Sequence, residues 1–259
     1  MLHSIDVVIP VHNGQELLHN CLKAVTGDAN IIVVDDASDN ANVTRIAAEK
    51  FGASFFKTKG NYGFGATCNY GASKGKAPLI LFLNSDVWLE PNAITEMAKE
   101  FESPDVGAVG ALLTFMQGTP HGPNGSVQHA GMAFDLTGKP FHIFIGWNPD
   151  NPRVNQRREL RCVTGACMMT RRDLWNSIGG FASVYGRGTY EDTEYCAMVL
   201  EKQQKVVFQP KARGQHWVGN SAYPVVNGQL QTDGGFPLLK NFELFRSRVP
   251  VVWDEYKIW

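Results

Sequence analysis

The sequence predicts an α/β protein with a mostly parallel central sheet flanked by helices. Strand and helix patterns alternate through the first hundred residues, which is typical of right-handed crossovers between parallel strands. Short apolar runs such as residues 79–83 lack polar alternation, as expected of strands that are covered on both faces. The chain has 259 residues, of which 44% are hydrophobic, so it is long enough to bury a sizeable core.

The first part of the chain, residues 1–105, contains the clearest elements. Strands are predicted at residues 5–11, 30–38, 53–58 and 79–84. Helical patterns separate these strands at residues 14–25, 42–51 and 63–75. Pro91 suits the first turn of a further helix after the fourth strand.

Polar side chains follow three of these strands at the point where each strand ends. They are His12 and Asn13 after the first strand, Asp35 and Asp36 after the second, and Asn84, Ser85 and Asp86 after the fourth. A single polar strand end has the alternative interpretation of a helix cap or a turn. Three of them on the same rim of one sheet predict a binding crevice, because open α/β sheets bind ligands at the carboxyl ends of their strands.

The pattern changes after Gly107. The sequence then predicts a strand at residues 106–115, strand-like pieces at 127–138 and 140–147, a strand, turn and helix over 160–181, a Gly-bounded loop leading into a helix over 185–204, and a strand at 205–210. No low-complexity linker interrupts the chain, so we expect one continuous domain over residues 1–259, with a second half at 106–222 and a tail at 223–259. Residues 242–259 are apolar and aromatic, which favours a packed terminal segment over a membrane or partner contact.

Composition limits the classes of function. A formal net charge of −1 gives no bulk attraction to nucleic acid or to an anionic membrane. The five cysteines form no CxxC pair, which favours a reducing compartment over a disulfide framework or a structural zinc site. No signal-peptide pattern and no apolar run of about 18 residues is present, so we expect a soluble cytoplasmic protein.

Three common ligand- and metal-binding motifs match the sequence poorly. Gly63-x-Gly65 is followed by Cys68 where a dinucleotide fingerprint needs Gly or Ala, and it comes after the third strand rather than the first. The segment GASKGKA has the wrong spacing for a phosphate-binding loop. The histidines of the loop-rich region (His121, His129 and His142) lack HExxH spacing, so a zinc hydrolase is not indicated.

An acidic cluster and one histidine are the candidates for chemistry in the second half. Glu191, Asp192 and Glu194 begin a predicted helix, where acidic residues also favour the helix dipole. A carboxylate there could act as a general base on a hydroxyl if burial raised its pKa. His216 follows the last predicted strand, and together with Asp86 and diphosphate oxygens it would make a site for Mg²⁺ or Mn²⁺.

Seven segments in order make the chain similar to a known family. They are VVIPVHNG, IIVVDDAS, GNYGFGATCNYG, LFLNSDV, CVTGACMMTRRDLWNSIGGF, YEDTEYC and QHWVGNS. Over about residues 4–222 they resemble family 2 glycosyltransferases, especially the rhamnosyltransferase-like branch that acts on bacterial polysaccharides. The resemblance implies the GT-A fold, a single Rossmann-like domain, with residues 1–105 as the nucleotide-binding half and 106–222 as the metal and acceptor half. It also implies an inverting transfer from a nucleotide-diphosphate sugar to an acceptor hydroxyl.

The resemblance also implies a role for individual residues. The nucleotide and donor sugar would contact Pro10, Val11, His12, Asn13, Asp35, Asp36, Asn61, Gly65, Asn69, Asn84, Ser85, Gly165 and Ala166. Asp86, at the family's Asp-x-Asp position, would bind the divalent cation (Mn²⁺ or Mg²⁺), and His216 would assist it. Asp192 would be the catalytic base with Glu191 beside it. The family more often has Asp where this chain has Glu194, whose role is therefore open.

Several alternatives stay open at the level of sequence. The donor could be dTDP-rhamnose, a UDP-hexose or a GDP-sugar. The acceptor could be a glycan, a lipid-linked molecule, another hydroxyl compound, or a hydroxylated base in DNA. A non-catalytic nucleotide- or glycan-binding module on the same scaffold is the competing class, whereas a nucleotidyltransferase would need a basic Gly-rich loop after the first strand. A peripheral contact with the inner face of the membrane and the oligomeric state are also open.

Overall fold

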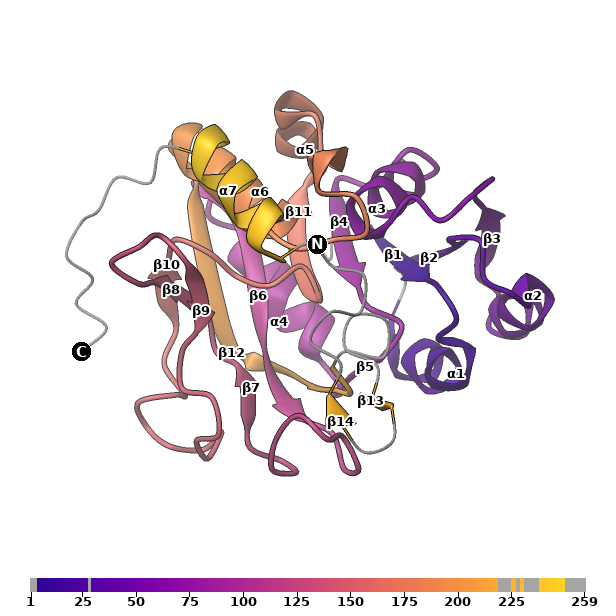
Figure 1. The fold of residues 1–259 in the computed structure, drawn as a ribbon, viewed down its shortest axis with the longest axis horizontal. Helices are drawn as coiled ribbons and strands as arrows, with labels where there is room; N and C mark the ends of the chain where they lie inside the picture. The colour runs from indigo at the N-terminus through magenta and orange to yellow at the C-terminus, as the bar shows by residue number, and fades with distance from the viewer. Residues whose placement is uncertain (1–3, 28, 219–224, 227–228, 231–237, 250–259) are drawn as a thin grey trace.

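The structure is a computed structural model, and it describes residues 4–27, 29–218, 225–226, 229–230 and 238–249. A ten-stranded sheet runs through the centre in the order β10-β12-β6-β11-β4-β1-β2-β3, with β5 paired to β12 and β7 paired to β6. Helices cover both faces of this sheet (Figure 1). The prediction of an α/β protein with a mostly parallel central sheet flanked by helices is confirmed.

The first part of the chain follows the predicted order of elements closely. It contains β1 (Ile5–Val11), α1 (Gln15–Ala24), β2 (Ala29–Asp35), α2 (Ala41–Lys50), β3 (Ser54–Lys57), α3 (Phe64–Ala72) and β4 (Leu79–Leu83). Strands β1, β2, β3 and β4 are all parallel, with β1 between β4 and β2. The carboxyl ends of β1, β2 and β4 therefore meet at one rim, as the polar strand ends predict.

The second part is more mixed in strand direction. It contains β5 (Val87–Leu89), α4 (Ala93–Glu100), β6 (Val106–Phe115), β7 (Val127–His129), β8 (Met132–Phe134), β9 (Pro140–His142), β10 (Arg158–Leu160), β11 (Cys167–Arg171), α5 (Arg172–Ile178), a 3₁₀ turn at Ser183–Tyr185, α6 (Glu191–Glu201), β12 (Lys205–His216), β13 (Val225–Val226), β14 (Gln229–Leu230) and α7 (Leu238–Arg248). Strand β11 is antiparallel to both of its neighbours, β4 and β6, so β6 and its parallel neighbour β12 run in the same direction as β4.

Alternating residues of the central strands explain why both faces are covered. Val7 and Leu81 pack into a core cluster with α1 and α4, whereas Val8 and Phe82 pack into a second cluster with α3, α5 and α6. Residues such as these are fully buried, as expected of strands with an unbroken apolar run. All five cysteines are free and lie in these buried regions.

Strand β12 corrects one expectation. The sequence pattern ends this strand at Pro210, because proline cannot donate a hydrogen bond to a neighbouring strand. The structure continues the strand to His216, with a register shift between Gln209 and Arg213 that accommodates the proline. The extension pairs with β5, a strand that the sequence pattern did not predict, and it places His216 opposite Val87.

The apolar tail is described only in part. Helix α7 places Phe245 in a small buried cluster with Tyr185 and Val249, so the described part of the tail packs against the protein. The remaining tail residues, 250–259, lie outside the described residues. Within the described ranges, no helix is both long enough and apolar enough to cross a membrane.

Candidate active site

A cleft of about 400 Å³ opens at the carboxyl ends of β1 and β4. The sequence-predicted residues that line it are Pro10, Val11, His12, Asp36, Asn61, Asn84, Ser85, Asp86, Gly165, Ala166, Glu191, Asp192 and His216. These residues come from both halves of the chain, so the structure brings most of the predicted site together. Asn13, Asp35, Gly65 and Asn69 are not among the lining residues.

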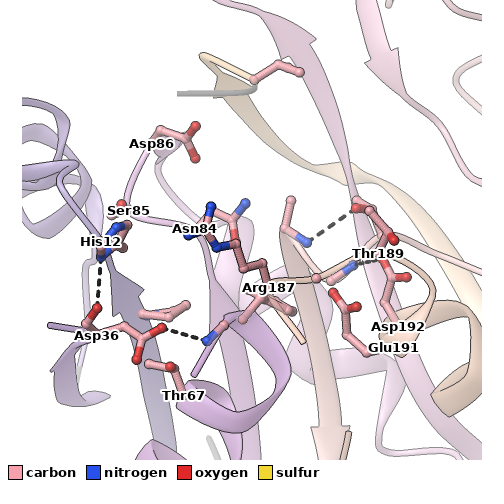
Figure 2. Close-up of a pocket in the computed structure, with 18 of the residues that line it drawn as sticks. His12, Asp36, Thr67, Asn84, Ser85, Asp86, Arg187, Thr189, Glu191 and Asp192 are labelled. Atoms are coloured by element: carbon pink, nitrogen blue, oxygen red, sulfur yellow. Dashed lines mark hydrogen bonds between the residues drawn. The ribbon is translucent and has the colours of Figure 1, made fainter. Parts of the chain in front are cut away.

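Asp36 organises the wall that the first half contributes. Its carboxylate accepts hydrogen bonds from the hydroxyl of Thr58 at 2.9 Å and from the backbone N–H groups of Tyr62 and Gly63 at 3.0 and 2.8 Å. His12 donates from Nδ1 to the Asp36 carbonyl oxygen at 2.8 Å, as Figure 2 shows, and its Nε2 lies 3.0 Å from Asn61 Nδ2. These contacts fix a polar rim at the ends of β1 and β2.

Asp86 and His216 form the candidate cation site. Strand β5 follows Asp86 directly and pairs with the end of β12, so the two side chains meet, with Oδ1 of Asp86 3.3 Å from Nε2 of His216. The Oε1 atom of Gln128 lies 3.2 Å from His216 Nδ1. An amide oxygen can only accept, so a neutral ring carries its proton on Nδ1 and turns the Nε2 lone pair towards Asp86. Two electron-rich atoms at this separation fit a bound divalent cation.

Asp192 and Glu191 form the acidic end of the cleft, in the first turn of α6. Asp192 accepts hydrogen bonds from the backbone N–H of Gly165 at 2.8 Å and of Thr193 at 2.7 Å. Burial raises the pKa of Asp192, and these two hydrogen bonds oppose the rise. Burial, followed by the charge of Asp192, raises the pKa of Glu191 to about 8, so Glu191 is mostly protonated near pH 7.

The loop before α6 is held by the C-terminal helix. Asn241 of α7 donates from Nδ2 to the carbonyl oxygens of Tyr185 and Gly188, both at 2.9 Å. Arg248 binds both carboxylate oxygens of Glu194, which also accepts a hydrogen bond from the Tyr185 hydroxyl. The structure thus gives Glu194 a role in fixing the loop, in place of a role in the cleft.

Two of the predicted residues that do not line the cleft, Asn13 and Asp35, support the polar rim at the ends of β1 and β2. Asn13 is exposed, with a left-handed φ of 53°, and its backbone N–H donates to the Ser38 hydroxyl at 3.0 Å. Asp35 is fully buried and accepts a hydrogen bond from the Ser38 backbone N–H at 2.9 Å. Both residues therefore hold Ser38, in the loop after β2.

The other two residues outside the cleft join the halves of the chain. Asn69 exchanges hydrogen bonds with the backbone of Phe181, donating to its carbonyl oxygen at 2.8 Å and accepting from its N–H at 2.9 Å. A side chain on Gly65 would crowd Phe181, since a Cβ there would lie 3.3 Å from that of Phe181. Both residues thus pack α3 against the segment that leads into the 185–190 loop.

Sequence reasoning missed several lining residues. They are Gly63, Phe64, Thr67, Gln128, His142, Thr164, Arg187, Gly188, Thr189 and Val218. Arg187 reaches across the cleft between Asn84 and Thr189 in Figure 2, and its guanidinium has no partner among the described residues. The Gly-bounded loop before α6 was predicted, but nothing local in the sequence shows that its arginine lines the cleft.

Comparison with known proteins decides the family. The model of "Glycosyl transferase family 2" matches residues 6–179, which is more than half of the chain. The chain belongs to glycosyl transferase family 2. This confirms the family that the seven segments indicated, whereas the rhamnosyltransferase-like branch stays a prediction.

Curated relatives of this family 2 chain come from bacteria. It is 27% identical over 192 residues to the O-antigen biosynthesis protein RfbC of Myxococcus xanthus, covering 68% of the chain and 14% of that protein. It is also 27% identical over 243 residues to an N-acetylglucosaminyltransferase of Sinorhizobium fredii, covering 88% of the chain and 56% of that protein. The chain therefore spans well under two thirds of the length of either relative.

Solved structures show the same fold. The crystal structure of GalNAc-T7 with UDP, GalNAc and Mn²⁺ superposes with a TM-score of 0.72 at 19% identity, covering 99% of this chain and 50% of that one. The mannosyltransferase PcManGT of Pyrobaculum calidifontis, in complex with GDP-Man and Mn²⁺, superposes with a TM-score of 0.60 at 15% identity, covering 83% and 57%. These matches confirm the GT-A fold of the family 2 chain.

Proposed function

We propose that the protein is an inverting glycosyltransferase that moves a sugar from a nucleotide-diphosphate sugar to an acceptor hydroxyl. The observation that carries this proposal is the position of Asp86 and Asp192 at opposite sides of one cleft (Figure 2). A leaving group at Asp86 and a base at Asp192 would suit a direct displacement between them. Membership of family 2 supports the same reaction class.

The nucleotide would bind against the first wall of the cleft. His12, Asp36 and Asn61 hold one another in a fixed arrangement there, so the polar rim is preorganised before any ligand binds. Asn84 and Ser85 continue this wall towards Asp86, so the ribose and diphosphate would lie between the strand ends.

Asp86 and His216 would hold Mn²⁺ or Mg²⁺, and the imidazole ligand favours Mn²⁺. Within the described residues, no group of three or more His, Cys, Asp or Glu side chains could hold a metal ion. Diphosphate oxygens and water would therefore complete the coordination. When bound, the cation would neutralise negative charge on the departing diphosphate. Solved structures of similar fold that hold UDP or GDP-Man with Mn²⁺ support this assignment.

Asp192 would act as the general base. The acceptor oxygen would attack the anomeric carbon as its proton passes to Asp192, and the bond between that carbon and the diphosphate oxygen would break on the opposite side. Burial raises the pKa of Asp192, which makes its carboxylate a stronger base than one in water. Gly165 and Thr193 fix the orientation of the carboxylate through their N–H groups. Glu191 would stay protonated beside it.

The names of the relatives suggest a donor and an acceptor class. Several are N-acetylglucosaminyltransferases, and a TarS structure of similar fold contains UDP-GlcNAc, so UDP-N-acetylglucosamine is our first choice of donor. The rhamnosyltransferase-like motifs make dTDP-rhamnose the second choice. The similarity to an O-antigen biosynthesis protein supports a glycan acceptor in polysaccharide synthesis. A lipid-linked acceptor at the inner face of a membrane stays a prediction from the sequence.

A thermal-shift panel tests the donor half of the proposal. UDP, dTDP, GDP and CDP are each added with and without Mn²⁺ to the wild type and to Asp86→Ala. A nucleotide present at about 100 times its Kd should stabilise the native state by about 2.7 kcal/mol, and the cation-dependent part should vanish in Asp86→Ala. If no nucleotide shifts the folded wild type, donor binding at this cleft is wrong.

Asp192→Asn tests the catalytic half. We expect the variant to bind the selected nucleotide normally and to lose transfer by about 10²- to 10⁴-fold, because the amide cannot accept the proton. Sugar transfer is followed by release of the nucleoside diphosphate, together with nucleotide binding by thermal shift. Near-normal turnover in Asp192→Asn would contradict its role as the base.

A further inference from the structure

Two histidines outside this mechanism lie together at the wall formed by β7 and β9. Nδ1 of His129 is 2.9 Å from Nδ1 of His142, and the rings meet edge to face. Burial lowers the pKa of His129 well below its usual range and that of His142 to about 4, with other histidines as the smaller cause. Both rings are therefore neutral near pH 7, and one nitrogen of the pair must donate to the other.

The backbone of Thr164 decides which nitrogen donates. Its N–H lies 3.4 Å from Nε2 of His129, and a backbone N–H can only donate, so this Nε2 carries a lone pair. A neutral His129 therefore has its proton on Nδ1 and gives it to Nδ1 of His142. His142 then has a lone pair on Nδ1 and its own proton on Nε2.

The Nε2–H of His142 opens on the cleft. His142 is among the lining residues, and its Nε2 has no partner in the described part of the chain. This atom is also absent from the set of fully buried, unpartnered side-chain atoms in the described residues. Because Nδ1 is occupied by His129, the polar atom that His142 presents to a ligand is an N–H donor.

We propose that His142 donates a hydrogen bond from Nε2–H to an oxygen of the bound nucleotide sugar, and that His129 is a positioning residue that sets this tautomer. The proposal rests on the proposed function, and it names a binding contact for the same cleft. Phosphate oxygens and sugar hydroxyls both accept hydrogen bonds, so either can be the partner. A neutral donor also suits a position near His216, since it adds no positive charge beside a bound cation.

The tautomer of His142 also decides whether this residue can be a metal ligand or a hydrogen-bond donor. A metal ligand needs a ring nitrogen with an available lone pair, which His216 has on Nε2 when Gln128 accepts from its Nδ1. On His142 the Nδ1 lone pair is occupied by His129, so only Nε2 could serve. His142 has a proton on that nitrogen, because His129 and Thr164 hold the ring in the other tautomer. The structure therefore assigns His142 to the substrate and leaves the cation to Asp86 and His216.

NMR of protein labelled with ¹⁵N-histidine tests the tautomers without any substrate. Long-range ¹H–¹⁵N spectra at pH 7 should show His129 neutral with its proton on Nδ1 and His142 neutral with its proton on Nε2. Assignment uses the single variants His129→Gln and His142→Gln, each of which removes one set of signals. A lone pair on His142 Nε2, or a charged His142 ring, would overturn the proposal, whatever donor the protein uses.

Binding measurements then identify the oxygen. The nucleoside diphosphate selected by the thermal-shift panel and its sugar ester are titrated, with Mg²⁺, into the wild type, His142→Phe and His142→Gln. We expect His142→Phe to weaken binding of the sugar ester about 3- to 10-fold, the usual effect of one neutral hydrogen bond, and His142→Gln to weaken it less. His19→Gln, on α1 against Phe51, is the matched control and should change nothing.

Comparison of the nucleoside diphosphate with its sugar ester shows whether His142 contacts a phosphate oxygen or a sugar oxygen. Equal weakening of the diphosphate and of its sugar ester would place the contact on a phosphate, and weakening of the sugar ester alone would place it on the sugar. Unchanged binding of both ligands in His142→Phe would overturn the proposal. Equal losses in His142→Phe and His142→Gln would also overturn it, because the ring shape and not the N–H would then be responsible.

Discussion

The two walls of the cleft are built in different ways. The first wall stands on the ends of the parallel strands β1, β2 and β4, whose positions are fixed by backbone hydrogen bonds along the whole register. The second wall consists of short strands and loops that individual side chains hold, notably Asn241, Asn69 and His129. The difference teaches that one site can combine a wall built on the ends of a continuous parallel sheet with a wall that depends on single contacts between distant parts of the chain.

The junction of the two walls should be the most sensitive position. Gly63 has a φ of 85°, and a Cβ on it would overlap the carbonyl oxygen of Gly186. We expect Gly63→Ala to destabilise the protein by about 3 to 4 kcal/mol, from left-handed backbone strain and overpacking together. Urea denaturation measures this loss.

Gly60→Ala is the matched control for that substitution. Gly60 lies in the same loop, and a Cβ there would approach only Tyr62, at 3.7 Å. We expect its effect on the free energy of unfolding to be within about 0.5 kcal/mol. If both variants lost the same stability, the walls would not be joined through Gly63.

The acidic end of the second wall should make stability depend on pH. The pKa of Glu191 is raised from 4.5 to about 8 in the folded protein, so between these values the folded state binds more protons than the unfolded state. This contribution to stability is complete below about pH 4.5 and is lost as the pH rises through 8. We expect the free energy of unfolding of the wild type to fall by on the order of 3 kcal/mol between pH 5 and pH 9 because of this group. Glu191→Gln should remove this fall.

Denaturation curves at pH 5, 7 and 9 measure this slope. Glu201→Gln is the control, since Glu201 is exposed at the far end of the same helix α6. The control should keep the pH dependence of the wild type. If the free energy of unfolding of Glu191→Gln kept the pH dependence of the wild type, the pKa of Glu191 would not be raised in the folded protein.

Loss of the Asn241 contacts should weaken the second wall alone. Asn241 is 2% exposed, and its amide satisfies the carbonyl oxygens of Tyr185 and Gly188. We expect Asn241→Ala to cost about 1 to 3 kcal/mol of stability, because two buried acceptors lose their donor. It should also lower kcat about 10-fold or more, since a loosened loop misplaces Asp192, while nucleotide binding at the first wall persists.

Ser247→Ala is the control on the same helix, because Ser247 is exposed and its hydroxyl donates to the Leu244 carbonyl. Enzyme kinetics measure kcat, which should report on the second wall, and thermal shifts with the nucleotide measure binding at the first wall. Nucleotide binding that fell in parallel with kcat in Asn241→Ala would mean that the walls are not independent.

The smallest effect is expected at the outer edge of the first wall. Asn13 is exposed, and its side chain exchanges hydrogen bonds with Asp39, outside the cleft lining. We expect Asn13→Gly to keep nucleotide affinity within about 2-fold, because glycine adopts the left-handed φ of this position without cost. A loss above 10-fold, measured by titration, would show that Asn13 contacts the nucleotide as the family resemblance suggests.

The same contrast explains what could be predicted from the sequence. The apolar runs of β1 and β4 locate the rim, and with it Asp86, because strand ends can be read from local pattern. Strand-like pieces were predicted over the positions of Gln128 and His142, but nothing local in such short segments shows that these two side chains line the cleft.

Long-range contacts explain the rest. Asn69 was expected in the cleft, but its amide binds the backbone of Phe181, 112 positions along the chain, and no local pattern reveals such a partner. The loop that carries Arg187 is held by Asn241 of α7, which follows in the chain only after α6 and strands β12, β13 and β14. Residues held by distant side chains can be recognised only in the folded structure.

The hydrogen bonds between α7 and the 185–190 loop also affect how the protein folds during its synthesis. Asn241 is translated 56 residues after Tyr185, whose carbonyl it binds. During translation the 185–190 loop therefore cannot take its final shape until α7 has left the ribosome. The acidic residues at the start of α6 would therefore reach their final positions beside the cleft only after α7 has been synthesised.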